Sequence, residues 1–146
     1  MRYLMIVKAS EQSERGEFPP NAEKMFAEMA AFNDEMIAAG VMLDAAGLKP
    51  SSAGKRVIFD GRGRTVVMDG PFAETKELIG GFWIIQCKDM DEALSWARRV
   101  PFEDGVVELR PFHEPEDFQG LASDDVIAQE QGWREAQAAK APKSGG

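Results

Sequence analysis

The residues best suited to chemistry lie in one unusual segment, residues 68–83, which reads MDGPFAETKELIGGFW. Pro71 restricts the residue before it, so the carboxylate of Asp69 is presented at a rigid corner where a strand ends. The paired Gly80 and Gly81 allow a backbone or a ligand to approach closely. A small pocket is therefore predicted here, with Asp69 as its polar and candidate catalytic group. The side chains expected to bind a substrate are Phe72, Glu74, Lys76, Phe82 and Trp83.

The same segment also has a purely structural interpretation. An Asp before Gly-Pro often caps its own turn, charged loop residues are commonly solvated, and paired glycines can mark a β-bulge. Both interpretations stay open at this point. The pocket requires Asp69 to face a cavity, whereas the structural alternative places it in its own turn with no cavity beside it.

His113 is the only histidine, and it follows the last predicted strand in the string RPFHEP. A histidine beside a carboxylate can act as a general base, which makes His113 a second candidate catalytic residue. A histidine at a strand exit is also commonly exposed and hydrogen-bonded to a neighbour. The catalytic interpretation needs His113 to meet Asp69, in the same chain or in a partner copy.

No cofactor or metal is predicted. The acidic pairs of the chain come without His or Cys at metal-ligand spacing, and the glycine-containing strings DGRGR and IGGF lack the spacing of a phosphate-binding or dinucleotide-binding loop. Cys87 lies in an apolar run, where it is expected to behave as a small hydrophobic residue rather than a nucleophile.

The elements that must position these groups follow from the apolar periodicity. Strands are predicted over residues 2–8, 41–48, 55–59, 65–68, 82–87 and 106–109, and helices over 22–39 and between Asp89 and Pro101. The stretch SEQSERGEFPP is expected to be a loop, and the turn string DGRG joins two strands into a hairpin. The order β-α-β, hairpin, β-α-β is typical of an α+β, ferredoxin-like fold with an antiparallel sheet and two helices on one face.

Such a sheet leaves its second face bare. A second copy commonly covers such a face, so a homodimer of the dimeric α/β-barrel type is expected.

Composition limits the partners. The 146 residues include 17 basic and 25 acidic side chains, a net charge of −8 with no basic cluster, which disfavours nucleic acid and anionic membranes. The apolar runs are too short to span a bilayer, and the N-terminus lacks the pattern of a signal peptide. A single cysteine suits a reducing compartment, so a cytoplasmic location is expected.

At residues 69–82 the string DGPFAETKELIGGF closely resembles the signature of the DGPF-type proteins of the YCII-related family. The strings MRYLMIVKA, DEALSWARRVP and VELRPF extend this resemblance over residues 1–113. The resemblance implies a ferredoxin-like domain that dimerises through its sheets. DGPF members are often encoded beside extracytoplasmic-function sigma factors, and other relatives include a dehydrochlorinase thought to use a His–Asp pair.

That pair does not transfer to this chain. The relatives carry the His on their first helix, whereas the matching string MFAEMAAFNDEMIAAG contains none. Residues 114–146 lie beyond the resemblance as an acidic C-terminal extension, with 7 acidic and 3 basic residues after position 112. They are expected to form a docking helix with a frayed end at the string AKAPKSGG.

Two hypotheses result. The first is a dimeric small-molecule-binding protein or cofactor-independent enzyme with a pocket near the DGPF loop. The second is a non-catalytic accessory or regulatory protein associated with sigma-factor signalling, which binds another protein through its dimer surface or its acidic tail.

Overall fold

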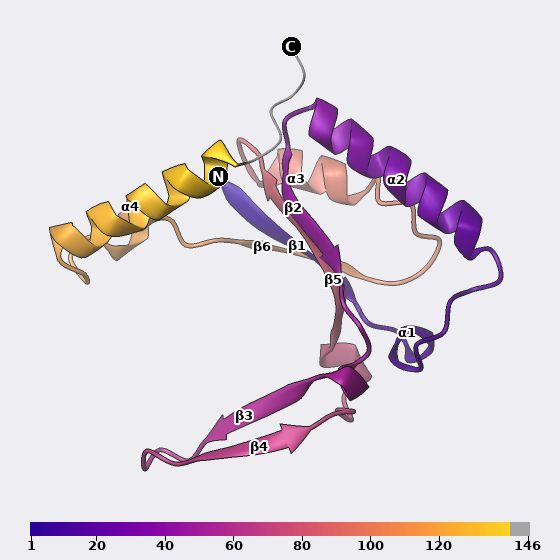
Figure 1. Ribbon diagram of the computed structural model, residues 1–146. Helices are drawn as coiled ribbons and strands as arrows, with labels where there is room; N and C mark the ends of the chain where they lie inside the picture. Colours follow the sequence, from indigo (N-terminus) through magenta and orange to yellow (C-terminus); the bar gives the residue numbers. More distant parts are fainter. Residues whose placement is uncertain (141–146) are drawn as a thin grey trace.

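A four-stranded antiparallel sheet forms the centre of the molecule, with strand order β2-β5-β1-β6 (Figure 1). The computed structural model describes residues 1–140. The sheet consists of β1 (Arg2–Lys8), β2 (Met42–Gly47), β5 (Ile79–Gln86) and β6 (Val107–Pro111). Together with its helices, the sheet makes this an α+β protein, as the pattern predicts.

Within residues 1–140, four helices and three short 3-10 turns accompany the strands. The helices are α1 (Glu11–Glu14), α2 (Ala22–Ala38), α3 (Met90–Ala97) and α4 (Asp124–Ala139); the turns are η1 (Ser51–Ala53), η2 (Thr75–Glu77) and η3 (Pro115–Phe118). The expectation of a loop over the stretch SEQSERGEFPP is wrong for its first part, because α1 lies there. Ser10 starts it: the Ser10 hydroxyl accepts a hydrogen bond from the backbone N–H of Ser13, and the Ser13 hydroxyl accepts one from the backbone N–H of Ser10.

The main core lies between the sheet and the helices α2 and α3. Alternate residues of the central strands, including Tyr3 and Met5 on β1 and Trp83 and Ile85 on β5, are almost completely buried. They belong to one cluster with α2 residues such as Phe32. Period-2 alternation therefore directs one face of the sheet to the helices.

The other face of the sheet carries the intervening residues. Register pairs Leu4 with Ile84 and Ile6 with Phe82 on this face. Ile6 is buried and the other three are half-buried. Ile6 is not part of the helix-side cluster, so the sheet has an apolar second face.

The strands β3 (Lys55–Phe59) and β4 (Thr65–Asp69) form a separate two-stranded sheet. Val57 pairs with Val67 and Ile58 with Val66, in the predicted hairpin. Figure 1 shows this hairpin extending away from the central sheet, beyond η1 and η2. Every residue of both strands is exposed.

Two strand boundaries differ from the prediction by more than one residue, because pairing outweighs local composition. β5 begins at Ile79 rather than Phe82, since Gly81 pairs with both Val7 and Gly47. β6 extends to Pro111, which pairs with Tyr3. Glycine and proline are weak strand formers, so the sequence pattern alone favours shorter strands.

The C-terminal extension contains η3 and α4. Ser123 caps α4, and Ile127 is its buried residue. Residues 141–146 of the predicted frayed end lie outside the described residues. Within residues 1–140, no helix is both long enough and apolar enough to cross a membrane.

Candidate functional site

A cavity of about 390 Å³ lies beside α2 at the edge of the sheet formed by β2 and β5. Met29 and Asn33 of α2 and Phe102 contribute side chains to it. Its remaining lining residues are Val7, Ala45, Ala46, Gly47, Gly80, Gly81, Phe82 and Trp83. Of the substrate-binding residues predicted from the sequence, Phe82 and Trp83 line this cavity, whereas Phe72, Glu74 and Lys76 do not.

Gly81 has a physical reason to be glycine. A Cβ atom at this position would lie 3.0 Å from the carbonyl oxygen of Ala46 on β2. That distance is tighter than side chains normally tolerate, so glycine allows β2 and β5 to pair closely at the cavity. The predicted close approach at the Gly-Gly pair is thus an approach of two strands.

Trp83 and Asn33 join the two walls of the cavity. The indole Nε1–H of Trp83 donates a hydrogen bond to Oδ1 of Asn33 at 2.8 Å. Phe32 packs edge-on against the Trp83 ring, with centroids 5.8 Å apart and an interplanar angle of 89°. This contact satisfies the polar atom of a buried tryptophan and holds the Asn33 amide in a defined orientation.

The described side chains that line the cavity are uncharged. No titratable side chain is among the described residues that line it, and Asn33 is its polar side chain. The Oδ1 atom of Asn33 is occupied by Trp83, and within residues 1–140 its Nδ2 group has no acceptor. An amide nitrogen carries two donors, so Asn33 can donate to an oxygen of a bound molecule.

Asp69 lies elsewhere, at the end of β4. Its carboxylate forms an ion pair with Nζ of Lys55 across the hairpin at 2.5 Å. The side chains of Asp69 and Lys55 are 75% and 67% exposed. Asp69 therefore neither lines the cavity nor caps its own turn within one chain, so the structure matches neither sequence interpretation of this residue.

The loop after Asp69 is anchored by Ser51. The Phe72 backbone N–H donates to the Ser51 hydroxyl at 3.1 Å, and that hydroxyl donates to Oε2 of Glu14 on α1. A Cβ atom on Gly70, which precedes Pro71 through a cis peptide bond, would lie 1.8 Å from the Ser51 carbonyl oxygen. The Gly-Pro step thus fits the loop against η1.

The other predicted side chains of this loop lie around its exterior. The guanidinium of Arg56 stacks on the Phe72 ring, 3.8 Å from its centroid. Glu74 immediately precedes η2 and Lys76 lies within it, and both residues are exposed. In a single chain the loop is a docked turn rather than a pocket wall.

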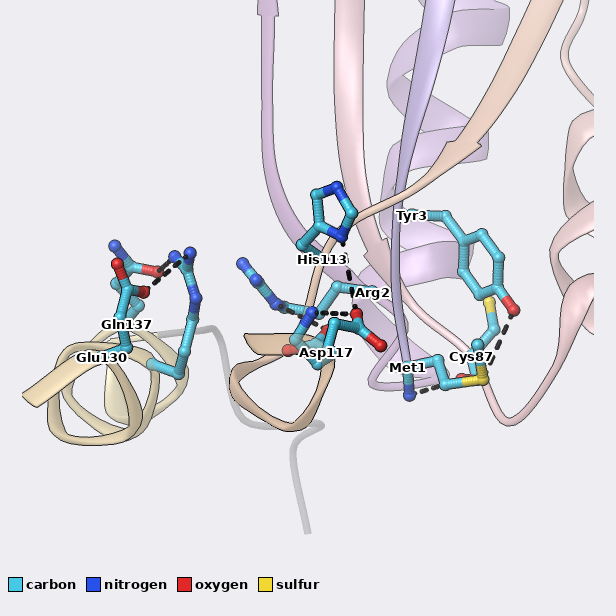
Figure 2. A network of polar contacts seen from close by, with 10 residues as sticks. Met1, Arg2, Tyr3, Cys87, His113, Asp117, Glu130 and Gln137 are labelled. Carbon is cyan, nitrogen blue, oxygen red and sulfur yellow. Dashed lines mark hydrogen bonds and ion pairs between the residues drawn. The ribbon is translucent and has the colours of Figure 1, made fainter. Parts of the chain in front are cut away.

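His113 lies beyond β6, next to η3. Its Nδ1 atom is 3.7 Å from Oδ2 of Asp117, and its side chain is 80% exposed. Figure 2 shows the ring directed at Asp117. Asp69, at the hairpin, has Lys55 as its partner, so the two predicted catalytic side chains do not meet within one chain.

Cys87 follows β5 and is buried. Burial raises the pKa of its thiol to about 11, and the nearby carboxylates of Glu92 and Asp89 add to this rise. Burial likewise raises the pKa of Tyr3, whose hydroxyl lies beside Met1 (Figure 2). The thiol is therefore protonated at neutral pH, which does not suit a nucleophile.

Sequence reasoning missed Asn33, the polar residue of the cavity. One signal was present: Asn33 follows Phe32 and lies four residues after Met29, within the apolar stripe of α2. A polar side chain on a core-facing stripe needs a hydrogen-bond partner. That partner, Trp83, is 50 residues away in the chain.

The side chains that could bind a metal ion do not form a cluster among the described residues. Among residues 1–140, no group of three or more His, Cys, Asp or Glu side chains is arranged to hold a metal ion.

Comparison with known proteins places the chain in a family. The model of the YCII-related domain matches residues 1–114, most of the chain, and the protein therefore belongs to the YCII-related family. An uncharacterised protein of Rhizobium meliloti (strain 1021) is 38% identical over 92 residues, which cover 61% of this chain and 73% of the relative.

Proposed function

We propose that this protein binds a small, neutral organic molecule in the cavity between α2 and the β2–β5 edge. The observation that carries the proposal is the polar pair Trp83–Asn33 in a cavity of about 390 Å³ whose other lining side chains are apolar. Ligand sites commonly combine apolar walls with a few oriented polar groups. Trp83 and Phe102, which pack on the helix side of the sheet, supply aromatic surface, and the Asn33 amide supplies the donor.

The ligand class follows from the lining. A carboxylate or phosphate would lose its hydration without gaining a cationic partner, which is costly in an apolar site. A flat molecule with a carbonyl or ether oxygen can place its apolar body on the aromatic surface and accept a hydrogen bond from Nδ2 of Asn33.

The proposal includes a ferredoxin-like fold and a homodimer. The antiparallel order β2-β5-β1-β6, with α2 and α3 contributing to one core on the same face, supports the fold. The apolar second face of the sheet, with Leu4, Phe82 and Ile84 half-buried, supports coverage by a second copy.

If the protein is an enzyme, we propose that the same cavity catalyses a cofactor-independent reaction. Because no described cavity residue titrates, the acid or base must come from outside the lining. Asp69 and His113 are the candidates, and each would have to reach the cavity of a second copy. In that case Asp69→Asn or His113→Ala would abolish turnover and leave ligand affinity unchanged.

Binding can be tested with benzamide and acetophenone as neutral probes and benzoate as their charged counterpart. The NMR signal of the Trp83 indole N–H reports directly on the cavity. We expect this signal to shift with the neutral probes and not with benzoate. Asn33→Ala should weaken the response, whereas Asp34→Ala, an exposed neighbour on α2, should not. Absence of a shift with every probe would contradict the proposal.

A second candidate is the non-catalytic accessory or regulatory protein, associated with sigma-factor signalling. The observation that favours it is the exposure of Leu121, Val126 and Trp133 in the C-terminal extension. Exposed apolar residues on a helix can dock on another protein. Deletion of residues 120–146 should then abolish the protein's effect on sigma-factor signalling, while the cavity still binds the neutral probes.

A further inference from the structure

The β3–β4 hairpin is apolar on both of its faces. Val57, Phe59 and Val67 alternate along the paired strands with Ile58, Val66 and Met68, so each face carries three large apolar side chains. All six are exposed, up to 76% for Phe59. A two-stranded hairpin is marginally stable when it stands alone in water, and this one therefore needs a cover.

The hairpin is also a basic part of an acidic chain. Residues 55–69 contain four basic and two acidic residues, a net charge of +2. The rest of the chain therefore has a net charge of −10, and the two parts sum to −8. The cover that suits it best is thus apolar and acidic.

Helix α4 has this complementary character. It contains four acidic residues and one basic residue, a net −3. Val126 and Trp133 are seven residues apart, two helical turns, so they share one side of the helix, and they are 49% and 53% exposed. Ile127, about 100° away around the helix, is the residue that α4 buries in its own chain.

The two elements extend from opposite ends of the central sheet. In Figure 1, α2 lies at the upper right, whereas α4 and the hairpin both project to the left, α4 at the top and the hairpin at the bottom. Neither has extensive contacts with the other, so a single chain leaves both surfaces open.

We propose that the hairpin of one copy packs against α4 of a second copy. A two-fold axis that lies across the strands brings the hairpin end of each chain to the α4 end of the other, so one dimer contains two identical contacts. Charge selects this arrangement, since the alternative axis would bring two basic hairpins together. The inference rests on the homodimer of the proposed function and specifies how its copies are oriented.

The area of the interface supports this arrangement. Four strands spaced about 4.8 Å apart and about 17 Å long give a sheet face of roughly 300 Å². Stable interfaces commonly bury about 800 Å² of accessible surface on each partner. A sheet face of this projected size is small for such an interface, and the hairpin and α4 of each copy supply additional contact surface.

Cysteine cross-linking of the full chain tests the contact. One chain carries Phe59→Cys and a differently tagged chain carries Trp133→Cys. The mixture should form an intermolecular disulfide under mild oxidation, and neither chain alone should, because like positions lie at opposite ends of the dimer. The buried Cys87 is present in every chain and serves as the common background.

Sedimentation equilibrium supplies the second measurement. Phe59→Ser and Trp133→Ser should each weaken dimerisation about tenfold or more. Leu94→Ser, which alters an exposed apolar side chain on α3, should leave it unchanged. Salt should weaken the wild-type dimer, because opposite charges meet in the contact.

The outcomes separate the two proposals. A wild-type chain that stays monomeric would refute both the homodimer and the contact, and would leave these surfaces to a different protein. A dimer that is unaffected by both serine variants, or that cross-links through Phe59→Cys alone, would refute the hairpin–α4 contact and keep the sheet-face dimer.

Discussion

Strand β5 and the β3–β4 hairpin consist of similar residues in opposite environments. Ile85 on β5 has no exposed surface, whereas Ile58 on β3 is 46% exposed, although both are isoleucines in antiparallel strands. β5 pairs on both sides and lies under two helices, but the hairpin strands pair only with each other. Residue type therefore does not determine burial here; the number of layers available to cover a strand does.

Truncating these two isoleucines is the strongest test of the difference. Ile85→Ala should lower the free energy of unfolding by about 2–5 kcal/mol, because it leaves a cavity in the core. Ile58→Ala should cost less than about 1 kcal/mol in dilute solution, where no second copy covers the hairpin. Urea unfolding measures both. Equal losses would mean that the hairpin packs against its own chain.

Two glycines, one in the loop after β4 and one at the end of β2, provide the next comparison. Gly70→Ala should destabilise the fold by about 3 kcal/mol, since its Cβ would collide with the Ser51 carbonyl and displace the loop. Gly47→Ala is the control: its Cβ would meet no atom within 4 Å, and the expected change is under about 1 kcal/mol. Chemical denaturation would contradict this account if the two variants were equally stable.

Alkaline pH should lower the free energy of unfolding through the buried Cys87 and Tyr3. Folding raises the pKa of Cys87 from 9.0 to about 11, so the unfolded chain releases this proton first. The stabilisation is complete below pH 9 and falls by about 2–3 kcal/mol as pH rises to 11. Tyr3, with its pKa also raised, acts in the same direction above pH 10.

Denaturation curves at pH 8, 9, 10 and 11 measure this loss. Cys87→Ala should show a smaller decrease over the same range, because only the Tyr3 contribution remains. A wild-type stability that is constant up to pH 11 would contradict a buried, protonated thiol.

The smallest effects are expected at the exposed charged residues. Asp69→Asn breaks the surface ion pair with Lys55, and His113→Ala removes a largely solvated ring. Each should change the free energy of unfolding by less than about 0.5 kcal/mol. A loss above about 1.5 kcal/mol from either variant would indicate that the residue is buried against a partner copy.

Much of the fold could be predicted because it follows from local patterns. The apolar run at residues 2–8, the helical stripe that includes Met25 and Met36, and the DGRG turn specify β1, α2 and the hairpin within one residue of the observed bounds. Helix α1 was missed because four residues leave no periodicity to recognise; the reciprocal Ser10–Ser13 cap is its main signal.

The candidate site was harder to predict for a different reason. Phe82 and Trp83 line a cavity, but it lies beside α2 rather than at the loop of Asp69 and Phe72, and their binding role stays a prediction. Asn33 gains its role from Trp83, a contact across 50 residues that no local pattern encodes. The position of Asp69 depends on the hairpin register that places it opposite Lys55, rather than on the Gly-Pro step that follows it.

The sequence by itself determined the kinds of elements, their order and the alternation of apolar residues, because these depend on neighbours within a few positions. The family also follows from it, over residues 1–114. Only the tertiary structure decided which apolar strands are covered, where the cavity lies and which polar groups meet. These properties depend on contacts between distant segments, and identical residue types such as Ile85 and Ile58 acquire opposite roles through them.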